Sequence, residues 1–153
     1  MEQLISVRSL FKETDAYAGK QIKVRGWVRN LRASKNFGFI NLSDGTFFSQ
    51  VQVVYGSELA NFNEISKLNI GAAVIVTGTL VLTPEAKQPF ELQASEVFVE
   101  GPSTPDYPIQ PKRHSMEYLR TVTHLRPRTN LFSATFRVRS VAAYAIHKFF
   151  QEN

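Results

Sequence analysis

Two runs near the start of the chain, residues 21–30 and 37–44, alternate between two kinds of side chain. A period of two residues is typical of a β-strand, because successive side chains point to opposite faces of a sheet. The face that would be buried consists of Ile22, Val24, Gly26, Val28, Gly38, Ile40 and Leu42. The opposite face consists of Lys23, Arg25, Trp27, Arg29, Phe37, Phe39 and Asn41. The two runs therefore predict a sheet that presents aromatic and basic side chains on its outer surface.

This outer surface suits unstacked bases, because an aromatic ring stacks on a base and a nearby Lys or Arg attracts its phosphate. The same side chains also suit an ordinary solvent-exposed face, and a Phe can pack under a loop. Charge adds a little to the binding interpretation. Residues 20–35 hold six basic side chains and no acidic one, and residues 101–153 hold eight basic against three acidic ones. Two such clusters favour a polyanionic partner.

The order of the remaining elements predicts the fold. A short amphipathic segment at residues 6–13 precedes the first strand, and a third strand is expected at residues 48–55. A helix capped by Ser57 and ending before Gly71 follows, with Leu59, Phe62, Ile65 and Leu68 at three-residue spacing. Two strands then come at residues 73–83 and 90–100. Three strands, one helix and two strands is the order of the OB-fold, a five-stranded Greek-key barrel. Other small barrels share this order, so the prediction rests on the whole pattern.

Several classes of protein are disfavoured by composition. The chain has no Cys, and its three His are scattered, so we expect no metal site and a reducing, cytoplasmic setting. The N-terminus lacks the features of a signal peptide, and no apolar run has the ~18 residues needed to span a membrane.

The C-terminal third differs in composition from the rest of the chain. Five of the seven prolines lie within residues 102–127, which predicts an extended hinge over residues 102–128 that is neither helix nor inner strand. A final helix capped by Thr129 or Asn130 is expected over residues 129–153, with a broad apolar stripe. That stripe is too apolar for a lone helix in water, so we expect the chain to be truncated inside a following domain. Alternatively, the helix packs back on the barrel or on a second copy of itself.

Five segments carry a resemblance to a known family. They are GWVRN at 26–30, FGFINLSDG at 37–45, VQVV at 51–54, HLRPRTNLF at 124–132 and FRVRS at 136–140. The first three resemble the anticodon-binding OB domain of the class IIb aminoacyl-tRNA synthetases, which serve Asp, Asn and Lys. The last two resemble the asparaginyl branch of bacterial type. The resemblance implies an anticodon-binding domain over residues 1–101, the hinge, and the start of a class II catalytic domain over residues 129–153.

The resemblance also implies roles for single residues. Phe39 matches an aromatic that stacks on an anticodon base, and Arg32, expected in the loop after the first strand, matches a basic residue that contacts the anticodon. Gln52 and Glu91 match the pair that reads the central uracil. Less certain contacts are Arg25, Arg29, Lys35, Phe37 and Gln50. Gln52 can equally be a plain solvent-facing residue, and Glu91 can pair with Lys87.

The implied partner is the anticodon loop of tRNA(Asn). The full-length parent would ligate asparagine to this tRNA with ATP and Mg²⁺, but motifs 2 and 3 of the catalytic domain are absent, so we expect no catalytic residue here and an inactive fragment. In the parent, the apolar stripe would form a homodimer interface through Phe136, Val138, Val141, Ala145 and Phe149. The alternatives are an aspartyl-tRNA synthetase of relaxed specificity and a free-standing OB-fold that binds single strands.

Overall fold

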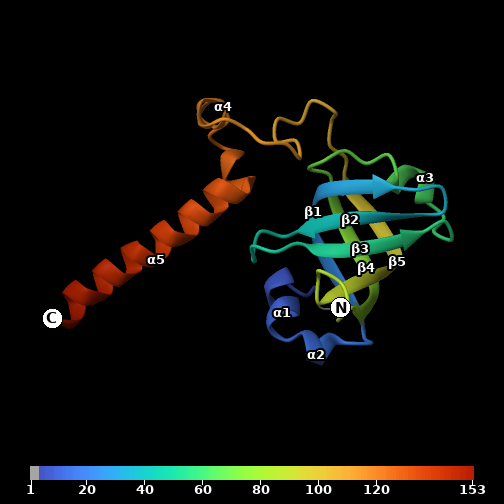
Figure 1. Ribbon diagram of the computed structural model, residues 1–153, viewed down its shortest axis with the longest axis horizontal. Helices are drawn as coiled ribbons and strands as arrows, with labels where there is room; N and C mark the ends of the chain where they lie inside the picture. Colours follow the sequence, from blue (N-terminus) through green and yellow to red (C-terminus); the bar gives the residue numbers. More distant parts are fainter. Residues whose placement is uncertain (1–3) are drawn as a thin grey trace. The chain divides into compact units, whose positions relative to one another are not determined.

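Five strands form a closed barrel in the computed structural model of the chain, which describes residues 4–153 (Figure 1). The strands are β1 (Gln21–Ala33), β2 (Phe37–Ser43), β3 (Val51–Gly56), β4 (Ala73–Leu82) and β5 (Phe90–Gly101). Around the barrel their order is β1-β2-β3-β5-β4, and only β3 and β5 pair in parallel. The predicted OB-fold is confirmed.

The first strand is long enough to serve both halves of the barrel. Residues Gln21 to Trp27 pair with β4, and the strand pairs with β2 from Trp27 onward. Where its pairing partner changes from β4 to β2, β1 passes very close to β2, since a Cβ on Gly26 would lie 2.6 Å from the carbonyl oxygen of Ser43. Gly26 therefore permits the close approach that the sharp coiling of β1 requires.

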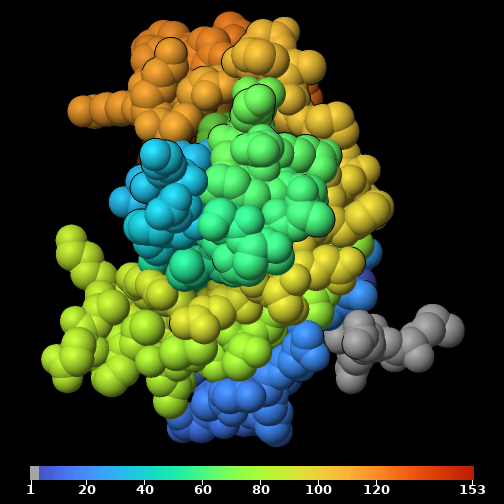
Figure 2. Space-filling model, turned by 90° about the vertical axis from the view of Figure 1, so that its right-hand side faces the viewer, coloured from blue at the N-terminus to red at the C-terminus, as the bar shows by residue number. Residues whose placement is uncertain are grey.

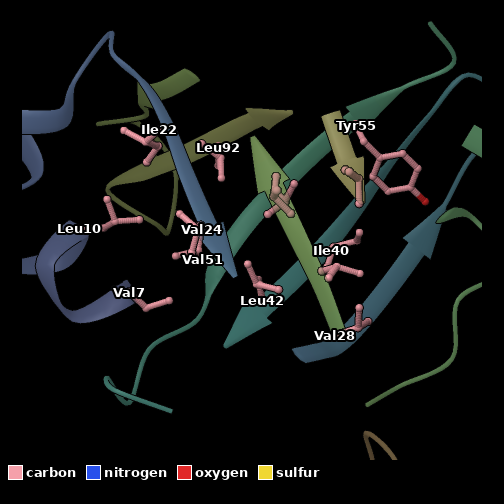
Figure 3. Packing of buried hydrophobic residues seen from close by; sticks show 14 of the residues in the cluster. Val7, Leu10, Ile22, Val24, Val28, Ile40, Leu42, Val51, Tyr55 and Leu92 are labelled. Atoms are coloured by element: carbon pink, nitrogen blue, oxygen red, sulfur yellow. The ribbon is translucent and has the colours of Figure 1, made fainter. Parts of the chain in front are cut away.

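The alternation seen in the sequence is the alternation of burial. Six of the seven residues predicted to face inward are buried, and the seventh, Gly26, is half-buried. Two residues of α1 (Val7–Lys12), Val7 and Leu10, extend from one end toward the strands that carry Val24 and Val51 (Figure 3). Ser6 caps this helix, and the Val7 N–H donates to Asp44 Oδ2 at 2.8 Å.

Two elements that follow β2 differ from prediction. The third strand begins at Val51 and not at residue 48, because residues 44–50 form a loop folded around Asp44, which accepts hydrogen bonds from Thr46. The expected helix is reduced to α3 (Phe62–Ile65), and Ser57 does not cap it. Instead the Ser57 N–H donates to the carbonyl of Asn36, which continues the pairing of β2 with β3. A short helix α2 (Thr14–Tyr17) was not predicted.

The apolar spacing that suggested a long helix has another cause. Leu59, Phe62, Ile65 and Leu68 all pack on the barrel core, although most of this segment forms turns. Its position is fixed by Asn61, whose Nδ2 donates to the Val97 carbonyl at 2.8 Å. Gly71 lies in the turn that precedes β4, with a φ of +89° that favours glycine.

The chain divides into two compact units, which are described separately. The N-terminal unit ends at Pro111 and the C-terminal unit is Lys112–Asn153. The latter contains α4 (Met116–Thr121), a 3-10 turn at Arg126–Arg128 and α5 (Asn130–Glu152). The exclusion of helix from residues 102–128 was wrong at α4, because four of the five prolines precede residue 112 and Ser115 supplies an N-cap. Thr129 caps α5, as one of the two predicted alternatives.

Across residues 4–153, no helix combines the length and the apolar character that crossing a bilayer requires.

Candidate nucleic-acid interface

A β-bulge in β1 determines which of its side chains face outward. The register with β2 runs Val28 opposite Leu42 and then Asn30 opposite Asn41, so Arg29 is the extra residue. A bulge shifts the alternation by one. Without it, Arg32 would share the inward parity of Val28. With it, Leu31 packs on the core and Arg32 is exposed. The prediction that Arg32 lies in a loop was wrong, since β1 continues to Ala33.

Arg32 and two phenylalanines form a cluster on this outer surface. Arg32 lies opposite Phe39 in the β1–β2 register, and its guanidinium carbon is 5.5 Å from the centre of the Phe39 ring. Phe37 meets Phe39 edge to face, with ring centres 5.5 Å apart. Phe39 is half-buried and Phe37 is exposed, so both rings are accessible in part. An aromatic platform beside a cation is suited to binding an unstacked base.

The turn that leads into these rings lies against the segment that follows β3. Figure 2 views this side of the molecule, where the β1–β2 turn, in cyan, borders the green segment after β3. The neighbourhood is fixed by pairing, since Phe37 lies opposite Gly56. Lys35 is exposed in this turn, so it adds a positive charge next to Phe37.

Gln52 and Glu91 are brought together by the parallel pairing of β3 with β5. Val53 lies opposite Leu92, so the residues just before them are neighbours on the outer face. Gln52 Nε2 donates to Glu91 Oε1 at 2.7 Å, and both side chains are half-buried. The alternative partner Lys87 is not the one observed. Glu91 instead accepts from two amides, since Gln88 Nε2 donates to the same oxygen at 2.6 Å.

The cluster and the amide–carboxylate pair belong to one surface. Gln52 lies opposite Asn41, which is two residues from Phe39 and on the same face of β2. Diagonal neighbours of this kind have Cα atoms about 7–8 Å apart, within reach of long side chains. A ring that can stack and a pair that can form hydrogen bonds are thus held on adjacent strands of one rigid sheet.

The match to known proteins agrees with this geometry. Residues 22–100 match the model of a protein family described as the OB-fold nucleic acid binding domain. The chain belongs to this family.

Similar proteins extend the match beyond this OB-fold nucleic acid binding domain. The chain is 60% identical over 153 residues to the asparagine–tRNA ligase of Clostridium perfringens, covering 99% of this chain and 33% of that protein. It is 61% identical over 146 residues to the asparagine–tRNA ligase of Bacillus cereus, covering 95% of this chain and 32% of that protein. The resemblance predicted from the motifs is confirmed, and the chain spans about one third of the length of these relatives.

A solved structure shares the fold. Asparaginyl-tRNA synthetase from Pyrococcus horikoshii, complexed with asparaginyl-adenylate, superposes with a TM-score of 0.84 at 24% identity, covering 99% of this chain and 35% of that one.

The OB-fold nucleic acid binding domain does not gather all the less certain residues into one site. Arg25 pairs with Ile75 in the half of the barrel formed with β4, seven residues along β1 from Arg32. Gln50 lies in the loop before β3. Two residues on the interface were missed: Asn41 occupied an outward position in the alternating pattern, but Gln88 gave no signal, because its role depends on the shape of a loop.

The residues predicted for dimerisation lie on α5, in the C-terminal unit. Phe136, Val138, Val141, Ala145 and Phe149 are all exposed within the described chain. At the start of α5, the guanidinium carbon of Arg126 lies over two rings, 4.7 Å from the centre of Phe132 and 5.9 Å from the centre of Phe136. The apolar side chains of α5 that follow Phe136 are exposed in the part of the chain that the structure describes.

Proposed function

We propose that the barrel binds the anticodon loop of tRNA(Asn) through the outer face of β1, β2, β3 and β5. The observation that carries the proposal is the hydrogen-bonded pair of Gln52 and Glu91 beside the Phe39 platform. The relatives support it, since those at about 60% identity are named asparagine–tRNA ligases. A free-standing single-strand binder is less well supported, because the similarity covers 99% of the chain and so continues past the barrel.

Each residue of the interface has a distinct role in this proposal. Phe39 stacks on one anticodon base, and Phe37 packs edge to face with its ring. Arg32 neutralises phosphate and contacts the same base, with Lys35, Arg29 and Arg25 adding positive charge along β1 and the turn after it. Such contacts position the loop, whereas hydrogen bonds to base edges distinguish one sequence from another.

Gln52 and Glu91 read the central base. Uracil presents an N3–H donor, which a carboxylate accepts, and a carbonyl oxygen, which the second amide hydrogen of Gln52 can reach. Cytosine presents an acceptor at N3 and an amino group, so it would face the carboxylate and the amide with the wrong partners. A buried polar group left unpaired costs about 1–3 kcal/mol.

The full-length protein would join asparagine to tRNA(Asn) with ATP and Mg²⁺ in the cytoplasm. No group of three or more His, Cys, Asp or Glu residues that could hold a metal occurs in the part of the chain that the structure describes. We propose that ATP and Mg²⁺ bind in the part of the relatives' length that lies outside this chain, and that the 153-residue chain alone is inactive. In the full-length dimer, the exposed residues of α5 would meet those of a second subunit.

Binding to anticodon stem-loops tests the proposal. The chain should bind a loop carrying GUU more tightly than one carrying GCU, and its affinity should fall with salt by a log–log slope of about −0.7 per phosphate neutralised. Equal affinity for both loops would indicate a single-strand binder without sequence preference. An affinity unaffected by salt would show that the basic residues at positions 20–35 are not the binding surface.

A further inference from the structure

One oxygen of Glu91 accepts both of the hydrogen bonds that reach this carboxylate. Gln52 Nε2 donates to Oε1 at 2.7 Å from β3, and Gln88 Nε2 donates to Oε1 at 2.6 Å from the loop between β4 and β5. Within residues 4–153, no hydrogen bond is formed to Oε2. Two donors on one oxygen fix the rotation of the carboxylate, and they leave the other oxygen as an acceptor.

Gln88 is itself held in place by the base of its loop. Thr83 Oγ1 donates to the Gln88 carbonyl at 2.9 Å, and the Thr83 N–H donates to the Pro89 carbonyl at 3.0 Å. The Ala86 N–H donates in turn to the Thr83 carbonyl at 3.0 Å, which closes the tip of the loop. Three hydrogen bonds to Thr83 therefore give Gln88 a defined backbone position from which its amide reaches Glu91.

We infer that Gln88 is a positioning residue for base reading, which locks the Glu91 carboxylate so that Oε2 is presented to the base. The inference rests on the proposed function, in which Gln52 and Glu91 read the central anticodon base. Gln88 need not touch that base. Its contribution is to prevent the carboxylate from rotating into orientations in which both oxygens are equally solvated and neither faces the base.

The fixed orientation of the Glu91 carboxylate matters because the preference for uracil is a difference between two hydrogen-bonding patterns. A fixed Oε2 accepts from uracil N3–H and opposes the N3 lone pair of cytosine. A carboxylate that is free to rotate can turn away from cytosine, which lowers the free-energy cost of binding the cytosine loop. Loss of Gln88 should therefore lower the ratio of affinities for the GUU and GCU loops, with little loss of affinity for the GCU loop. A merely structural role would weaken binding of both loops alike.

Gln88→Ala tests this inference, with Gln21→Ala as a matched control. Gln21 is also a glutamine whose Nε2 donates a hydrogen bond, to Ser95 Oγ at 3.3 Å, but it lies on the half of the barrel paired with β4. The ratio of affinities for GUU and GCU stem-loops is measured for each protein. Gln88→Ala should lower the ratio about two- to tenfold, the equivalent of one ordinary hydrogen bond. Gln21→Ala should leave it unchanged, and Gln88→Lys, which restores a donor to Glu91, should recover most of it.

A double-mutant cycle separates positioning from direct reading. In a Glu91→Ala background, Gln88→Ala should not lower the ratio further. A further drop there would show that Gln88 contacts the base itself, and an equal loss of affinity for both loops would show a structural role; either result overturns the inference. If the wild type prefers GUU and Gln88→Ala keeps the full preference, the inference alone fails. If the wild type has no preference, the proposed function fails with it.

Discussion

Replacement of Phe39 by alanine should weaken binding of the anticodon loop and leave the barrel folded. The ring is half-buried on the outer face of β2, where it makes an edge-to-face contact with Phe37 and a cation–π contact with Arg32. Stacking of one base on an aromatic side chain contributes about 1–3 kcal/mol, so affinity should fall about 5- to 150-fold. Fluorescence anisotropy with a labelled GUU stem-loop at constant salt measures this loss.

The cost to stability can be estimated from the same contacts. The edge-to-face pair with Phe37 contributes about 0.5–1.5 kcal/mol, and an exposed cation–π contact with Arg32 adds about 0.5–1 kcal/mol. Together these are smaller than the ~5–15 kcal/mol that stabilises a typical domain. Phe90→Ala is the control for a core position, because Phe90 is 1% exposed and its removal should cost about 3–5 kcal/mol.

Two results would refute this account of Phe39. Loss of the cooperative thermal transition in Phe39→Ala would show that the ring belongs to the core and that its assignment to the outer face is wrong. A folded mutant with unchanged affinity would show that no base stacks on the ring.

Three further predictions concern Arg32, Gly38 and the C-terminal helix. Arg32→Ala should weaken GUU and GCU loops by similar factors in parallel titrations, because phosphate contacts position the loop more than they read it; a selective loss for one loop would assign Arg32 to base reading. Gly38→Ala should destabilise the barrel by about 1–3 kcal/mol in urea denaturation, because a Cβ there would overlap the buried ring of Tyr55. An unchanged denaturation midpoint would contradict that packing. Deletion of residues 130–153 should leave the thermal midpoint of the barrel nearly unchanged, because the core cluster contains only residues up to Val99. The deletion should also reduce self-association in sedimentation velocity. A large drop in the thermal midpoint would show that α5 stabilises the barrel.

The sequence predicted the barrel well because burial in a strand follows a simple period. The alternation from Ile22 to Val28 and from Gly38 to Leu42 matches the observed burial. The position of Arg32 could not be predicted in this way, because the bulge at Arg29 reverses the alternation and nothing in the local sequence marks an extra residue. A bulge is fixed by the pairing of two strands distant in sequence.

The helices were predicted less well, for two physical reasons. The spacing of Leu59, Phe62, Ile65 and Leu68 suits a helix, but these residues reach the core through turns, so apolar period alone did not reveal the conformation. In the C-terminal unit, the expected hinge was inferred from the overall density of proline. The proline-free stretch before Pro127 was long enough for α4.

The candidate interface was predicted in part. Phe39 and Gln52 were placed outward by alternation, but only parallel pairing of β3 with β5 brings Gln52 to Glu91. Gln88 reaches the same carboxylate through a loop whose shape depends on hydrogen bonds to Thr83. Contacts of this kind require the folded barrel.

The most direct test of the account is the uracil preference of the Gln52–Glu91 pair. Stem-loops carrying GUU and GCU are titrated against the wild type and against Gln52→Ala and Glu91→Ala, with thermal unfolding as a check that each protein is folded. The account predicts a wild-type preference for GUU that each substitution shrinks, by about 1–3 kcal/mol for a lost or unpaired polar contact. An undiminished preference for uracil after both substitutions would contradict the central claim that these two side chains read the base.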